Sequence, residues 1–219
     1  MISYREIQKN ESIRTYIEAA DASLNALGYT RHSFEHVTKV ADMTGYILET
    51  MGYDAHTAEL GRIAAYLHDI GNMVNRADHA QSGAVLAFTI LDKLGFEPSD
   101  IADVVCAIGN HDETEGLPVS APAAALILAD KSDVRRSRVR SIDGGQFDIH
   151  DRVNYSVTSS SLEINDARDK VTLSLTIDTA FSTAAEYFEI FLGRMLLCKK
   201  AAGFFGLRFE LIMNGQSMM

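Results

Sequence analysis

The chain has 219 residues, of which 47% are hydrophobic and 23% are charged, an ordinary composition for a water-soluble globular protein. This length suffices for one mid-sized domain, or for one domain and a small appendage, with a core that needs no disulfide bonds. The formal net charge of −10 repels the phosphate backbone and makes long nucleic acids poor partners, although a local basic patch could hold a small phosphorylated ligand.

The first two thirds of the chain predict helices. Apolar residues recur at helical spacing, and glycines such as Gly28, Gly52 and Gly95 stand where the segments should end. We expect a mainly α-helical bundle over residues 1–145. Its predicted helices cover residues 7–28, 30–51, 56–70, 79–94, 98–110 and 122–136.

The pattern changes after a loop predicted at residues 141–146, which hold a pair of glycines. Residues 153–164 alternate in part, and residues 171–177 alternate cleanly between apolar and Ser or Thr positions, which predicts two strands. Residues 181–202 should form a helix and residues 207–213 a final strand. We therefore expect a small α+β unit of order β-β-α-β at residues 150–219. Its role is open, and one face or edge could contact the bundle or a second copy in a homodimer.

The sequence predicts a cytoplasmic protein. Residues 1–11 contain no apolar run typical of a signal peptide, and no apolar stretch has the length of a membrane-spanning helix. The two cysteines, Cys106 and Cys198, each lie in an apolar segment typical of a helix. We expect buried free thiols at both positions, which fit a reducing compartment.

Residues of metal-ligand type stand on, or at the ends of, different predicted helices. Imidazole and carboxylate groups suit iron, manganese, zinc or cobalt ions, a carboxylate can bridge two ions, and helical bundles gather such ligands in their cores. Each histidine taken alone would more commonly be a core residue, so the pattern depends on the whole set. The set is His36, His68, Asp69, His79, His111 and Asp130.

This set and the segments around it resemble the HD-domain superfamily of metal-dependent phosphohydrolases. The matching segments are RHSFEHV, AAYLHDIGN, HAQSGA, GNHDE and LILADKSD, which follow the family's order within residues 29–140. The resemblance implies two divalent metal ions, for which we expect iron or manganese, with zinc, cobalt, magnesium and nickel as alternatives. The first ion would be held by His36, His68, Asp69 and Asp130, and Asp69 would bridge to a second held also by His79 and His111.

The chain departs from the HD-GYP group of cyclic-dinucleotide phosphodiesterases. Asn72 stands where their HDIGK motif has lysine, and His111 is followed by Asp112 where that group has a second histidine. Hydrolysis of cyclic di-GMP is therefore not expected. Asp112 could take the place of the missing ligand.

A basic segment, KSDVRRSRVR, follows Asp130 directly. Helical spacing from a buried ligand can point Lys131, Arg135 or Arg138 at the mouth of the metal site, where guanidinium groups bind phosphates through paired hydrogen bonds. We assign these three residues, together with Asp69, to catalysis. The alternative is a solvated basic loop whose arginines pair with acidic residues.

Other residues have weaker claims to a functional role. Arg76 is a further candidate for phosphate binding. His32, His56 and His150 have no place in the signature, and we expect His32 and His56 at the surface or at helix starts.

The sequence thus predicts hydrolysis of a phosphate ester or anhydride in a small, nucleotide-like substrate, by a hydroxide that bridges two metal ions. A non-catalytic metal- or nucleotide-binding signalling protein is one alternative. A ribonuclease is another, disfavoured by the acidic charge and by the lack of a recognisable RNA-binding module.

Overall fold

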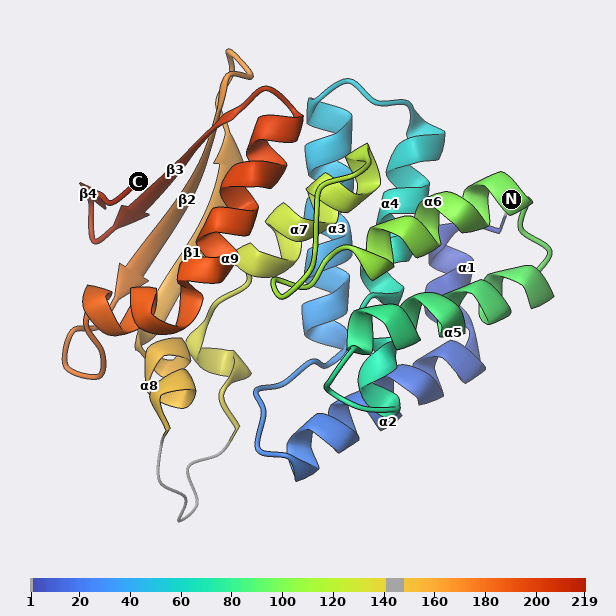
Figure 1. The fold of residues 1–219 in the computed structure, drawn as a ribbon, viewed down its shortest axis with the longest axis horizontal. Coiled ribbons are helices and arrows are strands. Elements are labelled where there is room, and N and C mark those ends of the chain that lie inside the picture. Colours follow the sequence, from blue (N-terminus) through green and yellow to red (C-terminus); the bar gives the residue numbers. More distant parts are fainter. Residues whose placement is uncertain (1, 141–147) are drawn as a thin grey trace.

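The first part of the structure is a bundle of helices, as the sequence predicts (Figure 1). The computed structural model describes residues 2–140 and 148–219, so the loop predicted at residues 141–146 lies outside the described residues. The bundle contains α1 (Tyr4–Lys9), α2 (Glu11–Ala26), α3 (Phe34–Thr50), α4 (Ala55–Leu67), the 3₁₀ turn η1 (Ile70–Met73), α5 (His79–Lys93), α6 (Pro98–Gly109) and α7 (Ala121–Ser132).

Helix α7 lies at the centre of the molecule. It begins at a serine cap, where the Ser120 hydroxyl accepts a hydrogen bond from the Ala123 backbone N–H, and its side chains are buried almost throughout. Its alanines let α3 and α4 pack against one side and α9 (Ala184–Phe204) against another (Figure 1). Asp130, in the last turn of α7, is thereby brought into the middle of the bundle.

A close backbone contact joins η1 to the start of α5. A Cβ atom at Gly71 would lie 1.9 Å from the His79 carbonyl oxygen and 2.5 Å from the Gly83 nitrogen, so only glycine fits there. The turn that follows His68 and Asp69 is therefore pressed against the first turn of α5. This contact places the histidine–aspartate pair beside His79.

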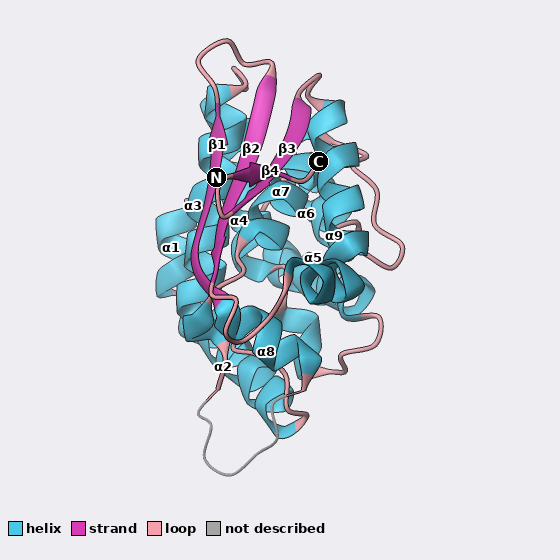
Figure 2. Ribbon diagram, turned by 90° about the vertical axis from the view of Figure 1, so that its left-hand side faces the viewer, coloured by secondary structure: helices cyan, strands magenta, loops and turns pink. Residues whose placement is uncertain are grey.

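The C-terminal unit is α+β, and the predicted fold class is confirmed. It contains β1 (Val157–Ile164), β2 (Lys170–Ile177), α9, β3 (Arg208–Met213) and the short β4 (Gln216–Ser217). The strands form one sheet in the order β1-β2-β3-β4, shown in Figure 2. Strand β2 pairs antiparallel with β1 and parallel with β3, because α9 crosses over between β2 and β3.

The start of this unit differs from the sequence prediction. Residues 153–156, predicted as strand, end helix α8 (Ile149–Ser156), which follows the 3₁₀ turn η2 (Arg136–Arg138). The Asp148 carboxylate accepts a hydrogen bond from the Asp151 backbone N–H and caps this helix, which favours helix over strand. The alternation of apolar and polar residues corresponds to a strand only from Val157 onward.

The two parts share one hydrophobic core. Buried residues of the sheet and of α9 join those of the bundle in a single cluster, with α9 packed between the sheet and α7. Both cysteines are free; Cys198 is buried, as expected, but Cys106 is partly exposed. No helix within the described residues has the length and apolar character needed to cross a membrane.

Candidate metal centre

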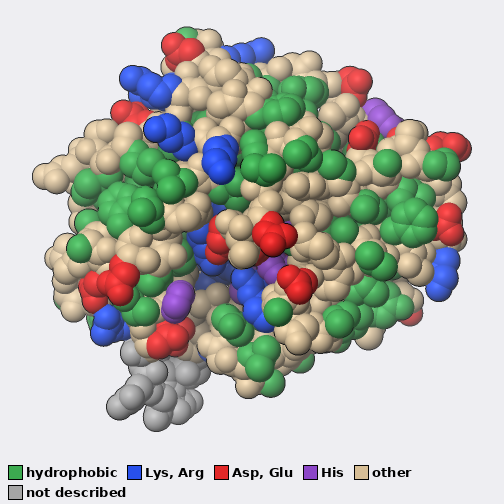
Figure 3. Space-filling view, viewed as in Figure 1, with side chains coloured by type: hydrophobic (Ala, Val, Ile, Leu, Met, Phe, Trp, Pro, Cys, Tyr) green, Lys and Arg blue, Asp and Glu red, His purple; other side chains and the backbone are tan. Residues whose placement is uncertain are grey.

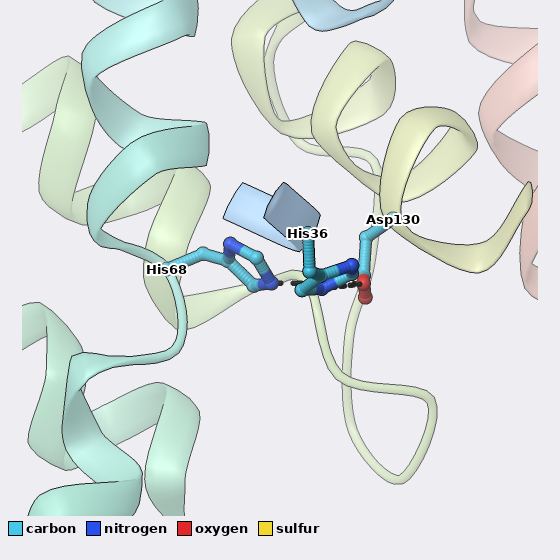
Figure 4. Close-up of side chains that lie close together, drawn as sticks. All are labelled: His36, His68 and Asp130. Carbon is cyan, nitrogen blue, oxygen red and sulfur yellow. Dashed lines mark ion pairs between the residues drawn. The ribbon is translucent and has the colours of Figure 1, made fainter. Parts of the chain in front are cut away.

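The six residues of metal-ligand type come together in the core of the bundle. His36 lies on α3, His68 and Asp69 follow α4, His79 begins α5, His111 follows α6 and Asp130 lies in α7. Three helices and the segments that follow two others thus converge on one point, and the four histidines and Asp69 are almost wholly buried. Figure 4 shows His36, His68 and Asp130 pointing toward one another from three different elements.

The hydrogen bonds of the four histidines fix which ring nitrogen faces the site. Each ring donates its Nδ1 hydrogen outward, because every partner of Nδ1 is an oxygen that can only accept. The Nε2 atom of each ring is therefore the one that faces the other ligands. The acceptors are the Asp133 carboxylate for His36 (2.8 Å), and the carbonyl oxygens of Ala65 for His68 (2.6 Å), Arg76 for His79 (3.2 Å) and Ile108 for His111 (2.6 Å).

The Asp69 carboxylate lies between two groups of histidines. Its Oδ2 atom is 3.1 Å from Nε2 of His68 and 3.5 Å from Nε2 of His36, while Oδ1 is 3.7 Å from Nε2 of His79. The Asn72 amide donates to Oδ1 at 2.9 Å and holds the carboxylate in this orientation. One oxygen faces each group, which is the arrangement that a bridging carboxylate requires.

The remaining ligand atoms complete two overlapping clusters. Asp130 Oδ1 lies 3.3 Å from Nε2 of His36 and 3.6 Å from Nε2 of His68, and the Nε2 atoms of His79 and His111 are 3.2 Å apart. Within the described residues, the sets His36–His68–Asp130 and His68–Asp69–His111 each bring their ligand atoms within 4.8 Å of one another and could hold a metal ion.

Two of these nitrogens have no hydrogen-bond partner. Nε2 of His36 and Nε2 of His68 are buried, and neither has a hydrogen-bond partner among the described residues. A buried polar atom without a partner costs about 1–3 kcal/mol, so such atoms need an explanation. A divalent cation bound to the lone pairs of both nitrogens would explain them, and the residues present therefore fit a metal ion.

All six of these residues lie within the part of the chain that matches a known family. The family model described as HD domain matches residues 33–135. These residues form an HD domain.

Three further similarities accompany this match. The uncharacterised protein MJ1020 of Methanocaldococcus jannaschii is 26% identical over 211 residues, which are 85% of this chain and 79% of that protein. Ribonuclease Y of Deinococcus radiodurans is 29% identical over 119 residues, which are 52% of this chain but only 19% of the ribonuclease. The solved structure of a predicted HD superfamily hydrolase from an uncultured Thermotogales bacterium is 28% identical, covers 57% of this chain and 67% of its own, and has a TM-score of 0.45.

Two residues outside the predicted set belong to the surroundings of the HD-domain site. Asp133 is buried and accepts hydrogen bonds from the His36 ring and the Lys39 ammonium, each at 2.8 Å. It stands three residues after Asp130, in the same basic segment, and that spacing was the only signal for it. A carboxylate behind a ligating histidine fixes the ring and makes it a better ligand.

His32 was expected at the surface or at a helix start, and this expectation was wrong. Its Nε2 atom lies 3.9 Å from Asp69 Oδ2, its ring contacts that of His36 edge-on at a centroid distance of 5.4 Å, and its side chain is only 13% exposed. The His32 backbone N–H donates to the Asp21 carboxylate at 2.7 Å, and its ring Nδ1 donates to the Thr30 carbonyl oxygen at 2.8 Å. These hydrogen bonds hold the segment before α3 against the site. His56 does lie at the start of α4 and is half exposed.

A pocket of about 410 Å³ opens over the metal centre. Lys131 and Arg138, two of the predicted phosphate-binding residues, line it, as do Arg76 and the exposed ring of Tyr29. Figure 3 shows Lys and Arg side chains (blue) inside a hollow in the middle of this face, with acidic side chains (red) beside them. This pocket joins the ligand cluster to the solvent.

The structure does not bring Arg135 into this pocket. Its guanidinium group pairs with Glu35 and with Asp133, and Arg136 instead donates to the Tyr155 carbonyl oxygen at 2.6 Å. Helix α7 ends at Ser132, so helical spacing from Asp130 does not extend to residue 135. The assignment of Arg135 to catalysis is therefore not supported by its position.

The charges of the site are strongly coupled. Burial alone would lower the pKa of His68, but the Asp69 and Asp130 carboxylates outweigh it and raise this pKa to about 10. Burial and the positive charges around it lower the pKa of His111 to about 3. Burial would raise the pKa of Asp69, yet the neighbouring imidazoles hold it well below its usual value. Without metal, the cluster therefore keeps a proton that a cation must displace.

We expect metal binding to tighten as the pH rises. The ordinary pKa of histidine is 6.5 and that of His68 is about 10, so between these values the metal-free site holds a proton that the ion must release. The apparent affinity should rise by up to about tenfold per pH unit in this window. The same raised pKa stabilises the metal-free fold below pH 6.5, and this contribution is lost as the pH approaches 10.

Calorimetric titration with Mn²⁺ at pH 6.5, 7.5 and 8.5, in buffers of different ionisation enthalpy, measures both the affinity and the proton released. An affinity that does not change with pH, with no proton released, would contradict this account of His68.

Proposed function

We propose that this protein is a metal-dependent phosphohydrolase that cleaves a phosphate ester or anhydride bond in a small, nucleotide-like substrate. Two divalent metal ions, iron or manganese, would be bound at the centre described above. Their ligands would be His36, His68, Asp69, His79, His111 and Asp130, with Asp69 shared between the two ions.

One observation supports this proposal above the others: four buried imidazoles turn Nε2 toward the cluster that holds the Asp69 and Asp130 carboxylates, of which Asp69 is buried and Asp130 is 11% exposed. A structural histidine has no need of this arrangement, because its second nitrogen could bond to the protein as the first does. Divalent ions at such a site lower the pKa of a bound water and neutralise charge on phosphate oxygens. No serine or cysteine nucleophile is then required.

The residues of the chain would bind and orient the substrate. The Lys131 ammonium is buried, and it lies 2.8 Å from Asp130 Oδ2 and 2.8 Å from Glu113 Oε2, so its charge is fixed at the edge of the ligand cluster. Arg138 donates to the Asp133 and Arg31 carbonyl oxygens, and its guanidinium group lines the pocket. Both cations are held in place before a phosphate arrives, which lowers the cost of binding it. The exposed Tyr29 ring at the rim offers a surface on which a base could stack.

Ribonuclease activity is a second candidate, and the similarity to ribonuclease Y is the observation that favours it. The net charge of −10 favours a small substrate over a long RNA chain. A metal-binding signalling protein without turnover is the remaining alternative.

Turnover assays separate these functions. Chain loaded with Mn²⁺, or with Fe²⁺ under anaerobic conditions, should hydrolyse bis(p-nitrophenyl) phosphate and at least one member of a panel of nucleotides and dinucleotides. Trimming of single-stranded RNA at a higher rate than any nucleotide would identify a ribonuclease. No turnover of any substrate by fully loaded protein would leave the signalling function and contradict the proposal.

A further inference from the structure

Part of the wall of the metal-centre pocket lies outside the HD domain. The domain match ends at residue 135, yet six lining residues belong to the C-terminal unit: they lie on helices α8 and α9 or, in the case of Asp148, cap the start of α8. These residues are Asp148, His150, Asp151, Asn154, Phe191 and Arg194. The C-terminal unit therefore faces whatever molecule occupies the pocket.

Arg194 of α9 is the cation that this unit contributes. Its Nε atom donates to Glu113 Oε1 at 3.0 Å, and its guanidinium carbon lies 4.4 Å from the centre of the Phe191 ring. Within the described parts of the chain, its two terminal nitrogens have no hydrogen-bond acceptor, and the side chain is 25% exposed. The guanidinium group is thus held through its Nε atom by Glu113 and across one face by the Phe191 ring, and its two terminal nitrogens are available to a ligand.

A chain of ion pairs connects this guanidinium group to the metal centre. Glu113 Oε2 lies 2.8 Å from Lys131 Nζ, which in turn lies 2.8 Å from Asp130 Oδ2. Three ion pairs in series, from Arg194 to Glu113, from Glu113 to Lys131 and from Lys131 to Asp130, thus connect this group to a proposed metal ligand on the same pocket. An anion bound to its fork would therefore share the pocket with a phosphate at the metal centre.

We propose that Arg194 binds a second phosphate of the substrate, so that the C-terminal unit completes the active site and selects substrates with two or more adjacent phosphates. A guanidinium fork matches two oxygens of a phosphate, and one that is already oriented loses little entropy on binding. This inference rests on the proposed function, because the first phosphate is the one bound at the metal centre. It gives the C-terminal unit a role in specificity.

Binding of inorganic pyrophosphate to the full chain tests this directly. Wild type, Arg194→Ala, Arg194→Lys and the control Arg208→Ala are loaded with Mn²⁺, freed of excess metal, checked for metal content and titrated calorimetrically with pyrophosphate and with inorganic phosphate. Arg208 is an exposed arginine on β3, in the same unit, and it does not line the pocket.

We expect equal metal content in all four proteins. Arg194→Ala should bind pyrophosphate about tenfold or more weakly and inorganic phosphate nearly as wild type does, since only the second phosphate reaches the fork. Arg194→Lys should fall between, because it keeps the charge and loses the fork. Arg208→Ala should match wild type.

The outcomes separate this inference from the proposed function. A wild-type chain that binds no metal overturns both. Pyrophosphate binding that is equal in wild type and Arg194→Ala overturns the role of Arg194 alone and leaves the metal site standing. If Arg194→Ala does not fold, Arg194→Lys decides: binding equal to wild type overturns the inference, and a severalfold loss supports it.

Discussion

Replacing Asp69 by asparagine (Asp69→Asn) is expected to remove most of the bound metal and to lower hydrolysis by about 10³-fold or more, with the helical fold retained. The Asp69 oxygens face different groups of histidines, at 3.1 Å from His68 and 3.7 Å from His79. An amide offers only one oxygen, and its nitrogen cannot bind a cation. Both metal positions should therefore weaken together.

Circular dichroism, metal content and turnover should be measured on the same preparation. Asp103→Asn, an exposed change of the same type on α6, is the matched control. His32→Ala would not serve as a control, because His32 lies 3.9 Å from Asp69. Full metal occupancy with normal turnover in Asp69→Asn would show that Asp69 is not a ligand.

Removing the Asp133 carboxylate (Asp133→Ala) should have the largest effect on stability. Its two oxygens lie within ion-pair distance of His36, Lys39, Arg135 and Arg138, and Asp133 itself is buried. Breaking a buried pair leaves the partner charge uncompensated, so we expect a loss of about 3–5 kcal/mol in the free energy of unfolding. The variant also lacks the hydrogen bond that orients the His36 ring, so its metal affinity should be roughly 10–100-fold lower than that of the wild type.

Urea unfolding and metal titration of Asp133→Ala and Asp133→Asn measure these effects. The asparagine variant keeps one oxygen acceptor and should lie between alanine and wild type. Asp92→Ala, an exposed aspartate on α5, is the control and should change neither quantity. Wild-type stability and metal affinity in Asp133→Ala would contradict the role assigned to this carboxylate.

The order of the ligand residues along the chain was enough to predict which of them meet, because each stands at the end of, or within, a helix that faces the core. The hydrogen bonds that orient them were not predictable. The contact between His36 and Asp133 spans 97 positions, and it depends on where α7 ends. That same end explains why Arg135 does not reach the pocket: the predicted helix ran to residue 136, whereas the chain leaves helical geometry at Asp133.

The residues of the pocket wall could not be predicted from the sequence either. Phe191 and Arg194 were predicted only as part of the helix at residues 181–202, and that helix does pack against the core. In the structure this helix, α9, packs against α7, which carries Asp130. Such a contact depends on tertiary packing, and no local sequence pattern predicts it. A sequence motif therefore finds the proposed ligands, and the structure is needed to find the residues that line the pocket beside them.

The number of metal ions bound per chain tests the two-metal centre most directly. Wild type, loaded with Mn²⁺ or with Fe²⁺ under anaerobic conditions and freed of excess metal, should hold two ions per chain by elemental analysis. His79→Ala should hold one. Of the two Asp69 oxygens, His79 lies near Oδ1, whereas His36 and His68 lie near Oδ2, so losing His79 should affect the second ion and not the first. At most one ion in the wild type under every loading condition would contradict the two-metal centre.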